Sequence, residues 1–323
     1  MKSLENIYKL TQQKLKSYVK KELKRKYNEV MVKDGYVYAK GNVPVLLVAH
    51  LDTVHAIPVK EIVYSDKGNK LTSPQGLGGD DRNGVYMILE IIKEINCHVL
   101  FVEDEEIGLI GATTFTETFK GDMDINYIIE LDRRGFKDAV YYSLDNKDFE
   151  LFITESSKGH FKTAQGTCSD ISEIAPFLGV AAVNLSSGYY KEHTLETYTL
   201  LNEVNENIGH VKEIINTAVD KPFEYKEKRY DEDDWGYWGG YGRGYLDEYV
   251  VQFYDRGNVI AQNYCMAMSD TEAVGATVWN IPSVKGEDII GVFLSGQEDR
   301  YDIVRTYIEG KEEIGSYERL AWS

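Results

Sequence analysis

Histidines and acidic residues recur along the first 193 residues, each at the end of an apolar run or in the loop that follows it. They are His50 with Asp52, Asp80, the adjacent Glu105 and Glu106, Asp132, and His193. Imidazole nitrogens and carboxylate oxygens bind divalent transition metals, and such ions can activate water for attack on an amide. A carboxylate that is not a ligand can carry the proton that this reaction moves. The residue types therefore point to metal-assisted hydrolysis.

The apolar runs predict the strands that would position these side chains. Residues 43–50, 97–102, 126–132 and 180–185 are short runs rich in aliphatic residues, which is typical of strands covered on both faces. From His50 to Asp132 the motifs follow one another at intervals of roughly 25 to 30 residues. The last two of these steps are each about the length of a helix plus a strand. Because ligands gather at the carboxyl ends of parallel strands, we expect the candidate side chains to meet at one edge of a sheet.

Each motif also has a structural explanation when it is taken alone. Asp80 and Asp81 follow a glycine-rich segment and precede a predicted helix, where acids can simply complement the helix dipole. The four acids at 103–106 can form a solvated loop. His-x-Asp, formed here by His50 and Asp52, is a short and weakly specific pattern. It is the complete set, in this order and spacing, that favours a metal site.

The set resembles the zinc-dependent exopeptidases with two co-catalytic metals, the clan of peptidase T, carboxypeptidase G and several aminopeptidases. Members carry His-x-Asp after a buried strand, Gly-x-Asp-Asp-Lys/Arg-x-Gly, Asp-Glu-Glu-x-Gly, a lone acid and a late histidine. The matching parts of this chain are residues 50–52, 79–84 and 104–108, then Asp132 and His193. The resemblance spans roughly residues 43–210.

Two divalent metal ions are implied by the resemblance. Zinc suits the mixed histidine and carboxylate set, and cobalt or manganese would also bind. Asp80 would bridge the two ions, with His50 and Asp132 completing one site and Glu106 and His193 the other. The ions would activate the water molecule that attacks the scissile carbonyl.

Four further residues receive roles from the resemblance. Glu105 would be the general base, and Asp52 would orient the first histidine by holding its other ring nitrogen. Asp81 would follow a peptide bond that is often cis in this clan. Asp170 ends a Gly-Thr-Cys-Ser-Asp segment similar to one near the substrate amine in some aminopeptidases. Asp170 could bind that amine, but we expect it rather to cap a helix at residues 171–178.

The expected fold is α/β. A three-layer αβα catalytic domain with a mostly parallel central sheet would cover residues 1–220. An acidic linker rich in Tyr, Trp and Gly would follow at 221–245, and a small C-terminal α+β domain of unknown role at 246–323. In that domain we expect strands at 249–254 and 288–294 and a short helix at 269–273. Too few residues separate the motifs for the inserted domains of many relatives, so the catalytic core should be compact.

The composition bears on partners and compartment. A net charge of −17 is unfavourable for binding nucleic acid or anionic membranes. The three cysteines are widely spaced and predict no disulfide framework, which favours a reducing compartment. The N-terminus has no apolar signal core and no run reaches transmembrane length, so we expect a cytoplasmic protein. The other histidines have no metal-ligand company in the sequence; they are His55, His98, His160 and His210.

These observations predict a dinuclear metal-dependent exopeptidase that hydrolyses short peptides, with an aminopeptidase favoured by the compact core. Two alternatives stay open. One is an amidohydrolase or deacylase of the same fold that cleaves a non-peptide amide. The other is a non-catalytic binding protein on a peptidase fold, against which the intact ligands and base count. The sequence leaves open the side-chain preference, the peptide length, the choice between amino- and carboxypeptidase, and whether the chain forms oligomers.

Overall fold

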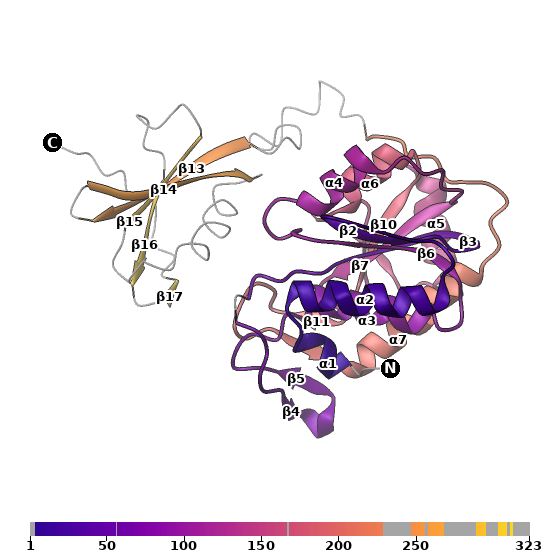
Figure 1. Cartoon of the computed structure of the whole chain (residues 1–323), viewed down its shortest axis with the longest axis horizontal. Helices are drawn as coiled ribbons and strands as arrows, with labels where there is room; N and C mark the ends of the chain where they lie inside the picture. The colour runs from indigo at the N-terminus through magenta and orange to yellow at the C-terminus, as the bar shows by residue number, and fades with distance from the viewer. Residues whose placement is uncertain are drawn as a thin grey trace. The chain divides into compact units, whose positions relative to one another are not determined.

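The computed structural model of the chain describes residues 4–55, 57–166 and 168–228, together with the backbone of strands between residues 247 and 312. The chain divides into two compact units, Met1–Arg229 and Tyr230–Ser323. Both are drawn in Figure 1, and each is described by itself. Among the helices of the described residues, none is long and apolar enough to cross a membrane.

An eight-stranded sheet forms the centre of the first unit, in the order β1-β2-β6-β3-β7-β10-β8-β9. The strands are β1 (Val30–Lys33), β2 (Tyr36–Ala39), β3 (Val43–His50), β6 (Cys97–Val102), β7 (Tyr127–Arg133), β8 (Asp138–Val140), β9 (Lys162–Ala164) and β10 (Ala182–Ser186). The four central strands, β6, β3, β7 and β10, run parallel to one another. These are the four strands predicted from the apolar runs, so the mostly parallel centre is confirmed.

Helices cover both faces of this sheet (Figure 1). They are α1 (Leu4–Tyr8), α2 (Gln12–Lys26), α3 (Gly79–Ile91), α4 (Ile110–Thr118), α5 (Lys147–Ser156), α6 (Ile171–Leu178) and α7 (Leu201–Asn216). Buried side chains of α2, α3, α5 and α7 pack on one face, and those of α4 and α6 pack on the other. This is the expected three-layer αβα arrangement.

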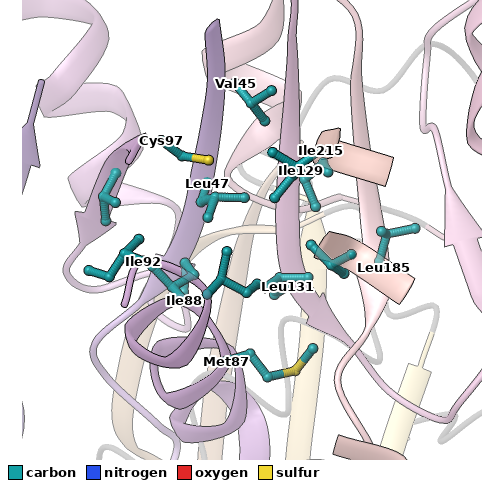
Figure 2. Packing of buried hydrophobic residues seen from close by; sticks show 14 of the residues in the cluster. Val45, Leu47, Met87, Ile88, Ile92, Cys97, Ile129, Leu131, Leu185 and Ile215 are labelled. Atoms are coloured by element: carbon teal, nitrogen blue, oxygen red, sulfur yellow. The ribbon is translucent and has the colours of Figure 1, made fainter. Parts of the chain in front are cut away.

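The alternation of side chains along β3 shows why the strand needs cover on both faces. Leu47 and its neighbours two positions away point into the core formed with α3 and α7, whereas Leu46 and Val48 point into the core formed with α4 and α6. Figure 2 shows Leu47 and Ile129 of the sheet packed near Ile88 of α3. Burying one such aliphatic side chain contributes about 1.5–3 kcal/mol.

A second, four-stranded sheet in the order β11-β12-β5-β4 lies within the first unit. Its strands are β4 (Val63–Ser65), β5 (Lys70–Thr72), β11 (Tyr189–Tyr190) and β12 (Tyr198–Leu200). A short 3₁₀ turn, η1 (Asp66–Gly68), joins β4 to β5. The loop between β11 and β12 carries His193, so this small sheet holds the last of the predicted ligands.

The first unit continues past the expected boundary at residue 220. Glu224 pairs with Val180 and Glu227 with Leu144 through isolated β-bridges. The second unit contains an antiparallel sheet in the order β14-β13-β15-β16-β17. Its strands are β13 (Asp247–Asp255), β14 (Asn258–Ala267), β15 (Ile289–Leu294), β16 (Ile303–Ile308) and β17 (Lys311–Glu312). The expected strands lie in β13 and β15, while the expected helix at 269–273 and most of the linker lie outside the described residues.

Candidate metal centre

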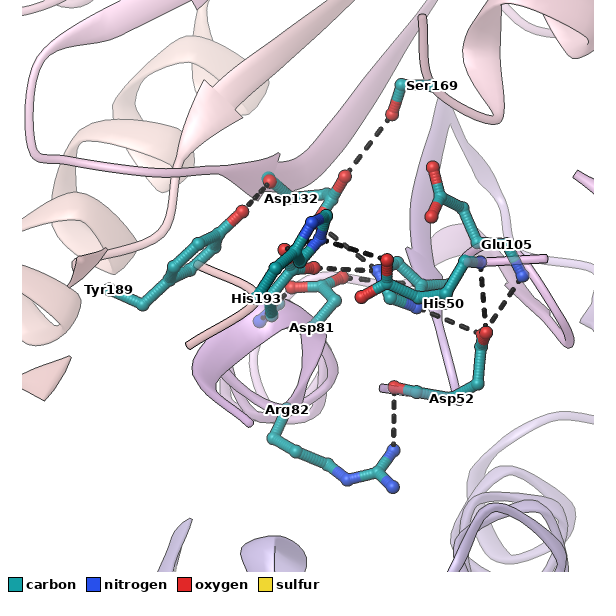
Figure 3. Close-up of polar contacts among 12 residues, drawn as sticks. His50, Asp52, Asp81, Arg82, Glu105, Asp132, Ser169, Tyr189 and His193 are labelled. Atoms are coloured by element: carbon teal, nitrogen blue, oxygen red, sulfur yellow. Dashed lines mark hydrogen bonds and ion pairs between the residues drawn. The ribbon is translucent and has the colours of Figure 1, made fainter. Parts of the chain in front are cut away.

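The predicted site residues come together at the carboxyl edge of the central sheet (Figure 3). His50 is the last residue of β3, and Asp132 lies near the end of β7. Glu105 and Glu106 follow β6, and Asp80 lies in the first turn of α3. Since β6, β3 and β7 are adjacent and parallel, the strand ends bring these segments together although they are far apart in sequence.

Asp80 lies between the two histidines. Its Oδ1 atom is 2.9 Å from Nε2 of His50, and its Oδ2 atom is 3.4 Å from Nε2 of His193. Asp132 Oδ1 lies 3.4 Å from the same nitrogen of His50, and Glu106 Oε2 lies 3.0 Å from that of His193. The five residues predicted as ligands therefore form two groups that share the Asp80 carboxylate.

Asp81 differs from Asp80 in what its carboxylate contacts. The peptide bond between them is cis, as the resemblance implied. Oδ2 of Asp81 accepts from the backbone N–H of His50 at 3.3 Å, and Oδ1 accepts from that of Gly84 at 2.9 Å. A Cβ atom on Gly84 would lie 2.2 Å from the carbonyl oxygen of Leu131 and 2.5 Å from the Asp81 carboxylate, so only glycine fits there.

Asp52 orients His50 and also holds the segment after β6. Its Oδ1 lies 3.1 Å from Nδ1 of His50, and its two oxygens accept the backbone N–H groups of Glu105 and Glu106 at 3.1 and 3.0 Å. Burial raises the pKa of Asp52, but His50 and these backbone donors outweigh burial and hold the pKa below its usual range. The ionised carboxylate keeps the hydrogen on Nδ1 of His50 and leaves the Nε2 lone pair for a metal.

The electrostatics of the site fit bound cations. Burial, reinforced by neighbouring acids, raises the pKa of Glu106 and raises that of Asp132 to about 7. Oε1 of Glu106 and Oδ1 of Asp132 are buried and have no hydrogen-bond partner among the described residues. A buried carboxylate oxygen without a partner is unfavourable unless a cation compensates it. Two imidazoles and three carboxylates in these groups are a suitable donor set for zinc.

Asp170 does not make the capping interaction expected from the sequence. It precedes Ile171, the first residue of α6, but its side chain accepts no capping hydrogen bond. The carboxylate is instead fully buried, and neither oxygen has a hydrogen-bond partner in the described part of the chain. Burial raises the pKa of Asp170, and Asp132 and Glu106 are among the charges that influence it. The expected cap is therefore wrong, because tertiary packing buries this side chain close enough to the metal centre for its charge to interact with those of Asp132 and Glu106.

A buried polar network behind Asp132 was missed by the sequence analysis. Glu130 is fully buried and accepts the hydroxyl of Ser169 at 2.6 Å. Asn184 accepts the backbone N–H of Asp132 at 3.0 Å and donates to the Ser169 hydroxyl at 3.1 Å. Tyr189 donates to the carbonyl oxygen of Asp132 at 2.7 Å. A carboxylate inside an otherwise apolar strand was the available signal for Glu130.

The N-terminal helices also support the site. Arg82 is buried, and its guanidinium donates to the carbonyl oxygen of Leu51 and, at 3.2 Å, to that of Leu10. The Tyr8 hydroxyl donates to Oδ1 of Asn83 at 2.5 Å. These bonds tie the segment between α1 and α2 to the residues that follow β3 and open α3. Nothing in the local sequence of that segment indicates this contact.

The model of peptidase family M28 matches residues 36–176. A search of curated protein sequences gave no match. Similar solved structures include the aminopeptidase PepT from Bacillus cereus ATCC 10987, which is 16% identical with a TM-score of 0.53 over 66% of this chain and 96% of that chain.

Two further structures are similar to the same extent. A tripeptidase from Staphylococcus aureus subsp. aureus mu50 is 16% identical, with a TM-score of 0.52 over 66% of this chain and 95% of that chain. A TET aminopeptidase from the marine sediment archaeon Thaumarchaeota archaeon SCGC AB-539-E09 is 15% identical, with a TM-score of 0.51 over 66% and 95%. At these identities the structures show a shared fold. Together with the family match at residues 36–176, they support a metallopeptidase whose domain is similar to peptidase family M28.

Proposed function

We propose that this metallopeptidase is a dinuclear zinc exopeptidase that removes residues from the amino ends of short peptides. The observation that carries the proposal is the position of Asp80, whose two carboxylate oxygens face different histidines, His50 and His193. A carboxylate placed in this way can serve two metal ions at once. The remaining ligands would be Asp132 on the His50 side and Glu106 on the His193 side.

Zinc bound at these residues would supply Lewis acidity, polarising the scissile carbonyl and lowering the pKa of water. The protein would supply the proton carrier. Glu105 has a carboxylate oxygen within 4.8 Å of ligand atoms of His50 and Glu106, so it lies at the reacting centre. Burial and the neighbouring Glu106 raise the pKa of Glu105 well above its usual range. A carboxylate with a raised pKa is suited to accept a proton from water and then deliver it to the leaving amine.

Asp170 supports action at the amino end of the substrate. Its carboxylate is buried, close enough to Asp132 and Glu106 to interact with their charges, and lacks a hydrogen-bond partner among the described residues. The α-ammonium group of a peptide would satisfy this carboxylate through a charge-assisted hydrogen bond. The terminal carboxylate of a peptide, by contrast, would be repelled by an ionised Asp170.

The test combines metal counting with peptide hydrolysis. The wild-type protein and the Glu105→Gln variant are loaded with zinc, and metal per chain is measured by plasma mass spectrometry. Hydrolysis of aminoacyl anilides, dipeptides and tripeptides is measured beside that of N-acetylated analogues. Glu155→Gln on α5 is the control, because Glu155 is exposed and undergoes the same change of charge.

We expect Glu105→Gln to keep its zinc and to lose hydrolysis by about 10²–10⁴-fold, because only the proton carrier is removed. Glu155→Gln should match the wild type in both measurements. Hydrolysis that survives Glu105→Gln would contradict the assigned role of Glu105. Cleavage of N-acylated amides, without cleavage of peptides that have free amino ends, would instead favour the amidohydrolase alternative.

A further inference from the structure

A second group of potential metal ligands lies outside the centre described above. His160 comes from the loop between α5 and β9, and Glu206 and His210 lie one turn apart on α7. Ligand atoms of the three residues lie within 4.8 Å of one another. We propose that His160, Glu206 and His210 form an additional zinc site that shares no residue with the catalytic centre.

The hydrogen bonds of Asn207 prepare His160 for this role. The side-chain amide nitrogen of Asn207 donates to the carbonyl oxygens of Phe136 at 3.0 Å and Ser186 at 2.6 Å. With the amide orientation set in this way, the Asn207 oxygen lies 2.8 Å from Nε2 of His160 and accepts its hydrogen. The other ring nitrogen of His160, Nδ1, therefore carries a lone pair that can bind a metal.

His210 lies between two carboxylates. Its Nδ1 atom lies 3.4 Å from Oε2 of Glu213, and its Nε2 atom lies 3.9 Å from Oε1 of Glu206. The Glu213 carboxylate thus lies beside the nitrogen that is turned away from Glu206. Histidines that bind metals commonly donate their other N–H to a carboxylate or a carbonyl group. His160 has such an acceptor in Asn207. Nδ1 of His210 is buried and has no hydrogen-bond partner among the described residues. This buried nitrogen without a partner distinguishes the cluster from a chance surface pair.

The charges around the cluster suit a divalent cation. The two imidazole rings are stacked, with centroids 3.8 Å apart and planes 15° apart. The carboxylates are those of Glu206 and Glu213, of which Glu213 is paired with Lys158. Neutral imidazoles with a carboxylate select zinc and similar transition metals over calcium or magnesium. For both rings to reach one ion, His210 must turn out of the stack, and its side chain, 21% exposed, has solvent on one side.

Zinc counting in the wild type and in a protein that lacks one catalytic ligand gives a direct test. Metal-free protein is dialysed against zinc, and bound zinc is counted by plasma mass spectrometry in the wild type, His210→Ala, Glu206→Gln and the control Glu155→Gln. The same comparison is made with His193→Ala in the background. The measured quantity is the difference in zinc count between each variant and its control in the same background. This difference does not depend on whether the catalytic centre binds two ions. Circular dichroism and the midpoint of thermal unfolding without zinc show that each variant is folded.

We expect His210→Ala and Glu206→Gln to bind one zinc fewer per chain than Glu155→Gln, in both backgrounds. Glu213→Gln should weaken this site by about 10–100-fold, because it removes the negative charge beside Nδ1 of His210. Peptide hydrolysis by zinc-loaded His210→Ala should equal that of the wild type. Equal zinc counts in the wild type, His210→Ala and Glu206→Gln would overturn the proposal.

Discussion

Nδ1 of His50 lies 3.1 Å from Oδ1 of Asp52, so the side chain that orients the metal-binding ring is only two residues away in the chain. The same carboxylate accepts the backbone N–H groups of Glu105 and Glu106. Asp52 therefore couples the end of β3 to the segment that follows β6. Loss of its charge should disturb the ligands of both metal groups without removing any of them.

Asp52→Asn should weaken zinc binding at the catalytic centre by about 10–100-fold, the usual effect of removing a residue that supports a ligand. The asparagine amide has only one oxygen that can accept hydrogen bonds, whereas both oxygens of the Asp52 carboxylate accept them. Competition with a fluorescent zinc chelator measures the affinity. Asp122→Asn is the matched control, since Asp122 is exposed in a loop. Equal affinities for the two variants would argue against the positioning role of Asp52.

Asp170→Asn should weaken the binding of substrates that have a free amino end. A lost hydrogen bond to a charged group costs about 1.5–3 kcal/mol, which corresponds to an increase in KM of about 10–100-fold. The kcat for the same tripeptide should change less, since Asp170 is not a predicted ligand or base. Steady-state kinetics on a tripeptide and on its N-acetylated form separate the effects. A proportional loss on both substrates would mean that Asp170 does not recognise the amine.

Zinc affinity of the catalytic centre should increase as the pH rises from about 5 to 8, because metal ligands must be deprotonated. Burial and Asp80 raise the pKa of Asp132 to about 7, so in the metal-free protein this carboxylate keeps its proton below that pH. For His193, burial lowers the pKa, but Asp80 and Glu106 outweigh burial and raise it. Both pKa values are raised, so at low pH zinc must displace a proton from each residue. Both shifts therefore weaken zinc binding as the pH falls.

Calorimetric titration in two buffers of different ionisation enthalpy measures the protons that zinc releases. The titration is best made with His210→Ala, which leaves the catalytic centre as the binding site of interest. We expect more protons to be released at pH 6 than at pH 8. A constant proton release and a constant affinity across this range would show that neither residue is a ligand.

Two glycines in helices should respond to alanine in opposite directions. In Gly84→Ala, the new Cβ would meet the carbonyl oxygen of Leu131 and the Asp81 carboxylate, which should lower the free energy of unfolding by about 1–3 kcal/mol or more. In Gly209→Ala, on α7, the new Cβ meets nothing within 4 Å, so the variant should gain about 0.4–1 kcal/mol. Urea denaturation of both variants measures the difference. Similar stabilities would show that the region around Gly84 is not closely packed.

Much of the centre was determined by sequence patterns. The runs at 43–50 and 97–102 became β3 and β6 with the predicted bounds, because four to eight aliphatic residues between polar ones have few ways to be buried other than as a central strand. Residues that directly follow such strands have little freedom. Placing His50, Glu105, Glu106 and Asp132 near one another therefore required only the rule that parallel strands end at a common edge.

Other features were decided by the tertiary structure alone. The sequence of Asp170 reads as a helix cap, but the packing of α6 buries its carboxylate without a hydrogen-bond partner among the described residues. The rings of His160 and His210 stack because the loop after α5 comes to lie against α7, across about fifty residues of chain. Such contacts depend on how the helices pack against the sheet, and this packing is determined by the whole core. No local pattern of residue types predicts this packing. The ligands at the strand ends are different, because the apolar composition of each strand is enough to predict that the strand is buried.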